Sequence, residues 1–403
     1  KPEDDNASEI SVEVCDSTNF YVNAALKFEE ETGIKVNVTN YYESEINSGD
    51  ESTVRNERIQ AELMAGKGSD IYAGMYLDFK ALGQNQHLCN IANWISTDSE
   101  FSEDKYYMNI LKSSFDDGNL YSIPLFMMFS VLGTTIEISD LDEQSLDWEE
   151  FFELTRGIKR NGVLYGITDY MLFIRRFRDR YDYFIDEENK KHKLDSPEMV
   201  KLLEQCKEWS LEGICIRYDA ENYMEIWENA FFKEYGGSGM YMLTNFRYDN
   251  PYLTEQLYHY DIPTDTEIKD KANKISPIEL ICINAASQYK GTAWNFVKFL
   301  LREDVQITGQ FTPINQKAAA EHDGKVLKEL TESFGLKINP DDIIEESKTI
   351  LQAIEKVPYT LYQTDIEKIV FKDEARRFFN NEISADEAAK NMVDRVELYF
   401  KEQ

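Results

Sequence analysis

The sequence has few basic residues for its length. Lys and Arg total 43 against 75 Asp and Glu among 403 residues, which gives a formal net charge of −32 at pH 7. A protein that grips a nucleic-acid backbone needs clustered cations, and docking on an anionic lipid surface needs a basic patch. The charge therefore argues against nucleic acid and against a lipid surface as partners.

Long apolar runs are also absent. The longest is residues 123–132, which is far short of the roughly 18–20 residues that span a membrane. The chain opens at Lys1 with a polar, acidic segment that has no signal-peptide pattern. We expect residues 1–9 to form a disordered tether, and the protein to be either cytosolic or given without its leader.

Cysteine and histidine are scarce and scattered. The five cysteines form no CxxC motif, which excludes zinc ribbons and thioredoxin-like sites. Their apolar neighbours indicate buried thiols, although a bridge between Cys206 and Cys215 stays open. The four histidines fall in no HExxH motif. We therefore expect no metal site and no cofactor.

Sequence motifs for a catalytic nucleophile or for a phosphate-binding loop are incomplete or absent as well. Residues 236–240 approach the GxSxG elbow, but Met240 breaks it. No GxGxxG and no GxxxxGK[ST] occurs. Paired carboxylates could hydrolyse a glycoside, but 75 acidic residues produce close pairs by chance. The sequence predicts no catalytic residue.

The first third of the chain alternates strand and helix patterns. Residues 10–14 and 34–38 alternate apolar and polar positions, as half-buried strands do, and 71–73 is a short buried strand. Apolar residues at helical spacing predict helices over 20–28 and 59–64, which Gly33 and Gly66 end. Strands separated by helices predict a parallel sheet.

The remainder of the chain has clear helix starts. Asp147 and Ser196 are predicted N-caps, the second followed by Pro197 at the first helical position. Residues 384–387 form a capping box, and Thr292 opens a further helix. Between these helices, 163–167, 240–243 and 278–286 are predicted strands, the last buried on both faces.

Nothing in the composition marks a flexible linker. The chain has 19 Gly and 9 Pro, below the usual share of about 12%, and no internal repeat. If the 403 residues form two lobes, we expect the hinge to consist of several strands that cross from one lobe to the other.

Seven segments together resemble one family. In order they are 24–38, 59–74, 116–126, 146–151, 237–246, 293–306 and 312–318. Each is weak alone, but their order and spacing resemble the extracellular solute-binding proteins of ATP-driven importers, in the carbohydrate-binding family to which maltose-binding protein belongs. The resemblance covers the chain from about residue 10 to 403.

The resemblance implies a two-lobed α/β fold of the type II periplasmic-binding-protein class, with a ligand cleft between the lobes. Lobe 1 would take residues 10–125 and 279–312, and lobe 2 residues 126–278 and 313–403. The hinge would lie near 125–126 and 277–280. It also implies a monomeric bacterial lipoprotein on the outer face of the cell membrane, or a periplasmic protein, that serves the permease subunits of an ABC transporter. Its lipid anchor would be missing from this sequence.

Sugars present apolar ring faces and hydroxyl edges, which aromatic and forked polar side chains bind. Such residues lie usefully after the carboxyl ends of parallel strands. In lobe 1 the candidate ligand residues are Asp16, Asn19, Tyr42, Glu43, Tyr76, Asp78 and Glu279, and Phe126, the first residue of lobe 2, is a further candidate. Asp16 and Asn19 could instead cap the following helix. Phe126 and Asp78 depart from the family pattern, which argues against a maltodextrin-like ligand.

In lobe 2 the candidates are Asp169, Tyr170, Arg175, Trp227, Asn245, Phe246 and Arg247. By resemblance, Phe246 stands where the family often has a stacking tryptophan. The helical neighbours of Trp227 favour a core position.

The resulting hypothesis is a binder that delivers an oligosaccharide to a permease by closing two lobes around it. Three alternatives remain: a binder of a cationic or peptide solute, an ectodomain that presents ligand to a receptor, and a secreted glycosidase.

Overall fold

The structure is a computed structural model whose described residues fall into two compact units. Unit 1 comprises Lys1–Phe129, Gly237–Asn245 and Ile275–Tyr362, and unit 2 comprises Ser130–Gly236, Phe246–Lys274 and Gln363–Gln403. The residues that the structure describes are 5, 7–15, 18–40, 51–74, 77–112, 118–134, 146–157, 163–228, 230, 232–237, 258–260, 263, 265, 274–322, 324–325 and 365–402.

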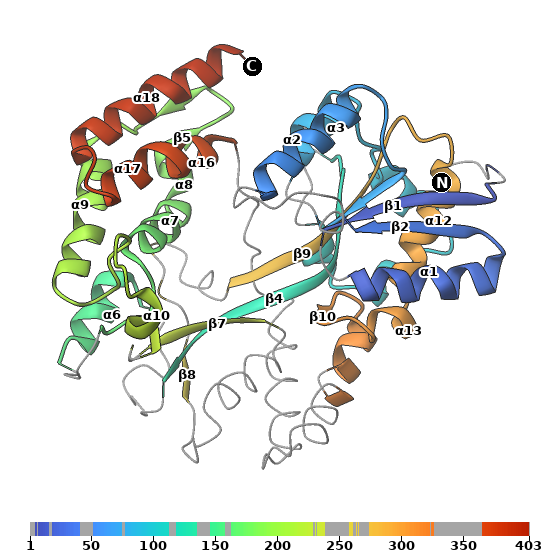
Figure 1. Ribbon diagram of the computed structural model, residues 1–403, viewed down its shortest axis with the longest axis horizontal. Coiled ribbons are helices and arrows are strands. Elements are labelled where there is room, and N and C mark those ends of the chain that lie inside the picture. Colours follow the sequence, from blue (N-terminus) through green and yellow to red (C-terminus); the bar gives the residue numbers. More distant parts are fainter. Residues whose placement is uncertain are drawn as a thin grey trace. The chain divides into compact units, whose positions relative to one another are not determined.

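Unit 1 is built on a mixed sheet with the strand order β10-β4-β9-β3-β1-β2 (Figure 1). Strand β1 (Glu9–Val14) pairs in parallel with β2 (Lys35–Asn40) and β3 (Ile71–Ala73). Strand β9 (Lys274–Ile283) pairs antiparallel with β3, and β10 (Thr312–Pro313) pairs antiparallel with β4 (Ile123–Thr134). The expected strands at 10–14, 34–38 and 71–73 are confirmed, with shifts of one or two residues at their ends.

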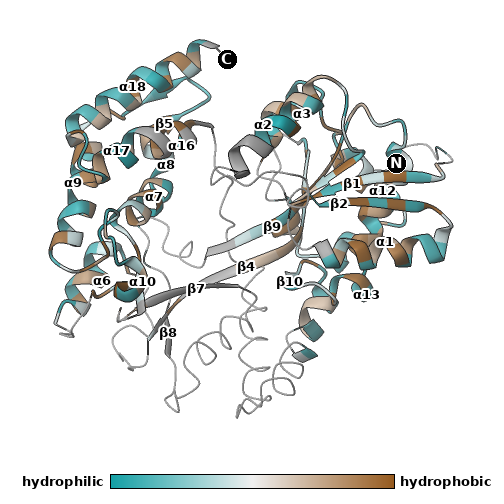
Figure 2. Ribbon diagram, in the orientation of Figure 1, coloured by the Kyte–Doolittle hydropathy of each residue, from teal (hydrophilic) through white to brown (hydrophobic). Residues whose placement is uncertain are grey.

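Helices accompany this sheet, and their bounds follow the hydrophobic pattern. They are α1 (Thr18–Thr32), α2 (Glu51–Met64), α3 (Phe79–Gln84), α4 (Ala92–Thr97), the 3-10 helix η2 (Glu103–Lys105), α5 (Met108–Leu111), α12 (Lys290–Leu300) and α13 (Glu303–Gln306). Gly33 takes a φ of +75° after α1, the left-handed stop that the sequence predicts. Hydrophobic and hydrophilic residues alternate along β1 and β2 (Figure 2), in agreement with half-buried strands.

Within the expected tether, residues 5 and 7–9 are described by the structure, and they are ordered. Asp5 accepts hydrogen bonds from the backbone N–H groups of Gly291 at 2.7 Å and Thr292 at 3.1 Å. It therefore caps α12 from the other end of the chain. This explains why α12 begins at Lys290, two residues before the start that Thr292 suggests.

Unit 2 consists of helices with short strands. The elements are α6 (Trp148–Thr155), α7 (Asp169–Asp179), α8 (Tyr181–Phe184), β5 (Ile185–Asp186), β6 (Lys191–His192), α9 (Pro197–Leu211), α10 (Tyr223–Glu228), β7 (Lys233–Gly237), β8 (Tyr258–Tyr260), α16 (Asp365–Ile369), the π-helix η7 (Val370–Ala375), α17 (Arg376–Phe379) and α18 (Ala385–Glu402). Asp147 forms the predicted cap of α6 as a full capping box with Glu150, and Ser196 caps α9.

One prediction for this unit needs adjustment. Residues 163–167 form no continuous strand: Tyr165 makes an isolated bridge with Phe232, and Thr168, just beyond the segment, makes one with Ile216. The predicted N-cap at Ser384 is confirmed, because the serine Oγ accepts from the backbone N–H of Glu387 and α18 begins at the next residue. The predicted strand at 240–243 lies outside the described residues.

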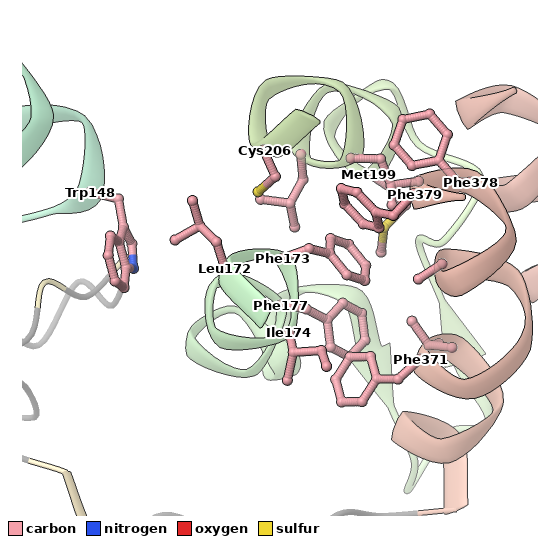
Figure 3. Packing of buried hydrophobic residues seen from close by; sticks show 14 of the residues in the cluster. Trp148, Leu172, Phe173, Ile174, Phe177, Met199, Cys206, Phe371, Phe378 and Phe379 are labelled. Atoms are coloured by element: carbon pink, nitrogen blue, oxygen red, sulfur yellow. The ribbon is translucent and has the colours of Figure 1, made fainter. Parts of the chain in front are cut away.

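An aromatic core holds unit 2 together. Phe173 and Phe177 of α7 point toward Phe371 and Phe379 from the C-terminal helices (Figure 3). The Phe173 and Phe379 ring centroids are 5.8 Å apart, and Phe177 meets Phe371 edge-on at 5.4 Å. Such rings supply a large buried apolar area and an additional attraction between their edges and faces. The C-terminal helices, residues 365–402, therefore pack against α7 and form one side of this core.

The unit boundaries differ from the expected lobes. Thr312 and Pro313 pair with Met127 and Phe126 of β4, and the backbone N–H of Asn315 donates to Gln306 at 2.8 Å. The described residues 313–322 thus belong to unit 1, where the sequence analysis assigned them to lobe 2. The chain passes between the units within β4, β7 and β9.

The five cysteines are free and buried. The prediction of buried thiols is confirmed, and the open alternative of a bridge between Cys206 and Cys215 is wrong. In the described ranges, no helix combines the length and apolar character that crossing a membrane requires.

Candidate functional site

Three parallel strands of unit 1 end level with one another. Val14 of β1 stands opposite Asn40 of β2 and Ala73 of β3. Beyond them, the Cys15 N–H donates to the Ala73 carbonyl at 3.2 Å, and Gly74 continues with a φ of +72°. We call this border of the sheet the carboxyl edge. In open α/β sheets, ligands bind outside this kind of border.

Strand β9 brings a carboxylate to the carboxyl edge. Ala73 pairs with Ile281, and the Gly74 N–H donates to the Leu280 carbonyl at 2.9 Å. Because β9 runs antiparallel to β3, the next residue, Glu279, lies just past the end of β3. Glu279 is a ligand candidate from sequence, and this position is compatible with that prediction, which stays a prediction.

The backbone of Glu279 is unusual. Its φ of +51° places a non-glycine residue in the left-handed region in the middle of a strand. Such a conformation costs about 1–3 kcal/mol and persists only where the surroundings impose it. Backbone strain of this kind concentrates at ligand clamps and active sites, which makes Glu279 the leading candidate among the described residues.

A buried tyrosine holds the Glu279 carboxylate. The hydroxyl of Tyr21, in the first turn of α1, donates to Glu279 Oε2 at 2.9 Å. Tyr21 is fully buried, and 9% of Glu279 is exposed. Burial, and secondarily the charge of Glu279, raises the pKa of Tyr21 well above its ordinary value, so the hydroxyl remains a donor at any physiological pH. The pair presents an oriented, partly desolvated acceptor at the carboxyl edge.

Phe126 has a different position from the one expected. It was predicted to contact ligand, but only 1% of it is exposed. Its ring meets Phe20 edge-on with centroids 5.1 Å apart, and it packs directly over Gly309. Phe126 is therefore a core residue of unit 1 that supports α1, the helix carrying Tyr21.

In unit 2, Asp169 and Tyr170 lie in structural networks. The buried Asp169 carboxylate accepts from the Ser210 hydroxyl at 2.7 Å and from the backbone N–H groups of Tyr170 and Tyr218 at 2.9 and 2.8 Å. The Tyr170 hydroxyl donates to the carbonyl of Phe371 at 3.2 Å, within the π-helix. Asp169 joins α7 to α9, and Tyr170 joins α7 to η7.

The other described candidates divide by environment. Asn19 is exposed on α1, and Asp78 caps α3 by accepting from the Ala81 N–H at 2.9 Å. Arg175 is half-buried on α7. Trp227 is half-buried on α10, and its Cδ1 lies 3.0 Å from a Cβ built on Gly166. Trp227 is not among the fully buried core residues, and its assignment to a ligand site stays a prediction.

Seven candidates lie outside the described residues: Asp16, Tyr42, Glu43, Tyr76, Asn245, Phe246 and Arg247. Four of them directly follow strands β1, β2 and β3 in the sequence. Their assignment to a ligand site stays a prediction.

Sequence reasoning missed Tyr21. Its position in a helical stripe with Ala24, Ala25 and Phe28 indicates a core residue, and the ring is indeed buried. The partner that gives its hydroxyl a role is 258 residues away, and no local pattern signals such a contact. Among the described residues, no group of three or more His, Cys, Asp or Glu side chains could hold a metal ion.

Comparisons with known proteins agree with this architecture. The model of the family described as bacterial extracellular solute-binding protein matches residues 23–332. The chain is similar to a solved structure, the solute-binding protein of an ABC transporter from Thermotoga lettingae TMO bound with α-D-tagatose. The identity is 17%, the match covers 98% of this chain and 100% of that one, and the TM-score is 0.62. No curated protein matches the chain. The expected two-lobed α/β fold is confirmed.

Proposed function

Because the chain belongs to the family of bacterial extracellular solute-binding proteins, we propose that it captures a neutral oligosaccharide between its two units. It then delivers the sugar unchanged to the permease subunits of an ABC transporter. It works as a monomer in the periplasm, or on the outer face of the cell membrane as a lipoprotein. Its role is binding and not catalysis.

The observation that carries this proposal is the Tyr21–Glu279 pair at the carboxyl edge. A carboxylate is an acceptor that two sugar hydroxyls can share, and hydrogen bonds to a charged group contribute about 1.5–3 kcal/mol. The hydrogen bond from Tyr21 orients the carboxylate before ligand arrives, which lowers the entropy cost of binding. The strained backbone of Glu279 fits a residue retained for its side chain.

Two further observations support a sugar. The relative from Thermotoga lettingae is bound with α-D-tagatose. The segments that follow the strands of unit 1 in the sequence are rich in Tyr, Asp and Glu, and Phe246 stands at the family's stacking position by resemblance. Aromatic rings cover the apolar faces of sugars, and acidic groups accept from their hydroxyls.

A cationic solute is the second candidate, which the net charge of −32 and the Glu279 carboxylate favour. Salt separates the two functions. Affinity for a neutral sugar changes little between 20 mM and 500 mM NaCl, whereas affinity for a cation falls as the attraction is screened.

A glycan panel read by thermal shift identifies the ligand, and calorimetry then measures its affinity in variants. Glu279→Gln removes the charge and keeps the size, so we expect neutral-sugar affinity to fall about tenfold, equivalent to about 1.4 kcal/mol. Phe246→Ala and Tyr42→Ala each cost about 1–3 kcal/mol as stacking is lost. Steep salt dependence together with indifferent aromatic variants would replace the sugar with a cation.

Tyr21→Phe tests whether Tyr21 positions the carboxylate. It removes one hydroxyl from a buried ring, and we expect affinity to fall threefold to tenfold, the contribution of about one hydrogen bond. Tyr72→Phe is the matched control, because the hydroxyl of the buried Tyr72 donates to Glu62 Oε2 at 3.3 Å. Equal losses of affinity in both variants would show that the loss comes from a less stable fold and not from a misplaced Glu279 carboxylate.

Mass spectrometry of the sugar after incubation tests for catalysis. The bound sugar should be recovered intact, and product at more than one equivalent per protein chain would establish a glycosidase.

A further inference from the structure

Unit 1 contains a pocket of about 920 Å³. Its walls come from the end of α1, from the segment 100–106, from α12 and α13, and from residues 315–317. A volume in the range of about 300–1,000 Å³ is typical of small-molecule sites. We call this the helix pocket.

The helix pocket is separate from the carboxyl edge. Thr32 and Ile34 line it and precede Lys35, the first residue of β2, whereas Asn40 ends β2 at the carboxyl edge. Six residues of strand at about 3.3 Å each put roughly 20 Å between the two places. One solute molecule at the carboxyl edge does not fill both.

The charges that line the helix pocket balance. Four acidic residues face four basic ones: Glu100, Asp104, Glu303, Asp304, Lys105, Lys298, Arg302 and Lys317. Arg302 reaches Glu31 at 2.6 Å and Asp304 at 2.8 Å, and Lys298 reaches Asp98 at 2.9 Å.

Lys317 pairs with Glu303 at 2.8 Å, and the exposed Asp104 and Lys105 have opposite signs. A charged ligand would have to compete with these pairs, whereas a neutral one would not. On a chain of net charge −32, this pocket is locally neutral.

Two polar groups on its walls have no hydrogen-bond partner among the residues that the structure describes. The amide of Asn295 and the hydroxyl of Tyr106 make no hydrogen bond within the described part of the chain. Both groups remain in contact with solvent. If either were fully buried, it would be among the buried polar atoms that lack a hydrogen-bond partner in the described residues, and it is not. Between them they offer two kinds of donor and two acceptors.

The remaining lining includes three aromatic residues, Phe28, Phe101 and Phe299, besides Thr32, Ile34, Asn315 and Gln316. Phe101 and Tyr106 stack with centroids 4.9 Å apart, and the Arg302 guanidinium lies over the Phe299 ring at 4.6 Å. Phe28 contacts Phe299 edge-on at 5.2 Å. Small-molecule sites combine largely apolar walls with a few directed polar groups.

We infer that the helix pocket is a second binding site, contained in unit 1, for a neutral hydroxyl-bearing ring compound of the saccharide class. Tyr106 and Asn295 hydrogen-bond its hydroxyls, and the aromatic edges contact its ring. This inference stands whichever solute binds at the carboxyl edge.

The Ile34 side chain, which lines the pocket, provides a direct reporter. We would label the Ile δ1 methyl groups of the full chain and titrate it with D-glucose, N-acetylglucosamine, maltose and myo-inositol. The Ile34 methyl resonance should shift saturably with at least one of them, while that of Ile185 in unit 2 stays still. Tyr106→Phe should weaken this binding twofold to tenfold, the range for one hydrogen bond.

Asn295→Trp fills the pocket and should abolish the Ile34 shift. Asn93→Trp is the matched control, since Asn93 is an exposed helical asparagine on α4 outside the pocket, and it should leave the titration unchanged. The melting temperature of each variant establishes that it folds. No saturable Ile34 shift with any sugar, or an undiminished shift in Asn295→Trp, overturns the second site.

Spermidine and citrate test the ligand class. If either shifts Ile34 at lower concentration than every sugar, the pocket takes a charged ligand and the inference is wrong. Glu279→Gln should leave the Ile34 titration unchanged while it lowers affinity at the carboxyl edge. Failure of the helix pocket and failure of the proposed transport function therefore give different results.

Discussion

Gly309 leaves room for the ring of Phe126. A Cβ at this position would lie 2.3 Å from Phe126 Cζ, a distance that forces a buried ring to move. We expect Gly309→Ala to lower the free energy of unfolding by about 1–3 kcal/mol, the usual cost of overpacking. Gly157→Ala is the control, because nothing lies within 4 Å of its Cβ. Urea denaturation measures both, and equal values would contradict the packing at Phe126.

The ionised carboxylate of Asp98 makes part of the free energy of unfolding depend on pH. Its burial raises the pKa, but hydrogen bonds from Lys298 and from Trp294 Nε1 outweigh this and hold the pKa of Asp98 at about 2. Since the folded pKa lies below the ordinary 3.8, the stabilisation is present above pH 4 and is lost as the pH falls toward 2.

We expect Asp98→Asn to be about 1–2 kcal/mol less stable than the wild type at pH 6 and to approach it at pH 2.5. Urea denaturation at the two pH values measures the difference. A gap that stays constant across this range would mean that the charge of Asp98 contributes nothing.

The candidate residues show where sequence reasoning stops. Glu279 was identified because it precedes an apolar run after Ser276 and Pro277; the structure places it beside the end of β3, and its role in binding stays a prediction. Asp169 was identified because it lies in an irregular stretch, but its carboxylate serves donors 41 and 49 residues away. Networks between distant segments carry no periodic signal, so sequence cannot separate a structural carboxylate from a ligand-binding one.

At the scale of elements, local chemistry was a better guide. Asp147 and Ser196 cap their helices as predicted because a cap depends on the next three residues only. The three residues of β3 were predicted without error, because an apolar run this short between two turns is too short for a helix and is buried as a strand. The start of α12 was predicted wrongly, because its cap comes from Asp5, 286 residues before Gly291.

This remote cap can be tested. Asp5→Ala should lower the free energy of unfolding by about 1 kcal/mol, the typical contribution of an N-cap. It should also speed hydrogen exchange at the amides of Gly291 and Thr292. Asp5→Asn retains an acceptor oxygen and should keep most of the protection. Unchanged exchange at both amides in Asp5→Ala would mean that the N-terminal segment does not hold α12.

At the scale of the whole molecule, the proposed function requires the two units to close around a solute. The radius of gyration from small-angle scattering should then be smaller with saturating sugar than without it, because closure expels solvent from between the units. The pocket variant Asn295→Trp should close like the wild type. An identical scattering profile with and without saturating ligand would contradict closure of an open form.

The aromatic core of unit 2 has a consequence for how the protein is made. Phe371, Phe378 and Phe379 come far later in the chain than Leu132 and Trp148, yet all five belong to one core. Until the three phenylalanines are synthesised, α6, α7 and α9 expose an apolar face with nothing to cover it. The core of unit 2 therefore cannot close before residues 371–379 have been made, which makes it a late-folding part of the chain.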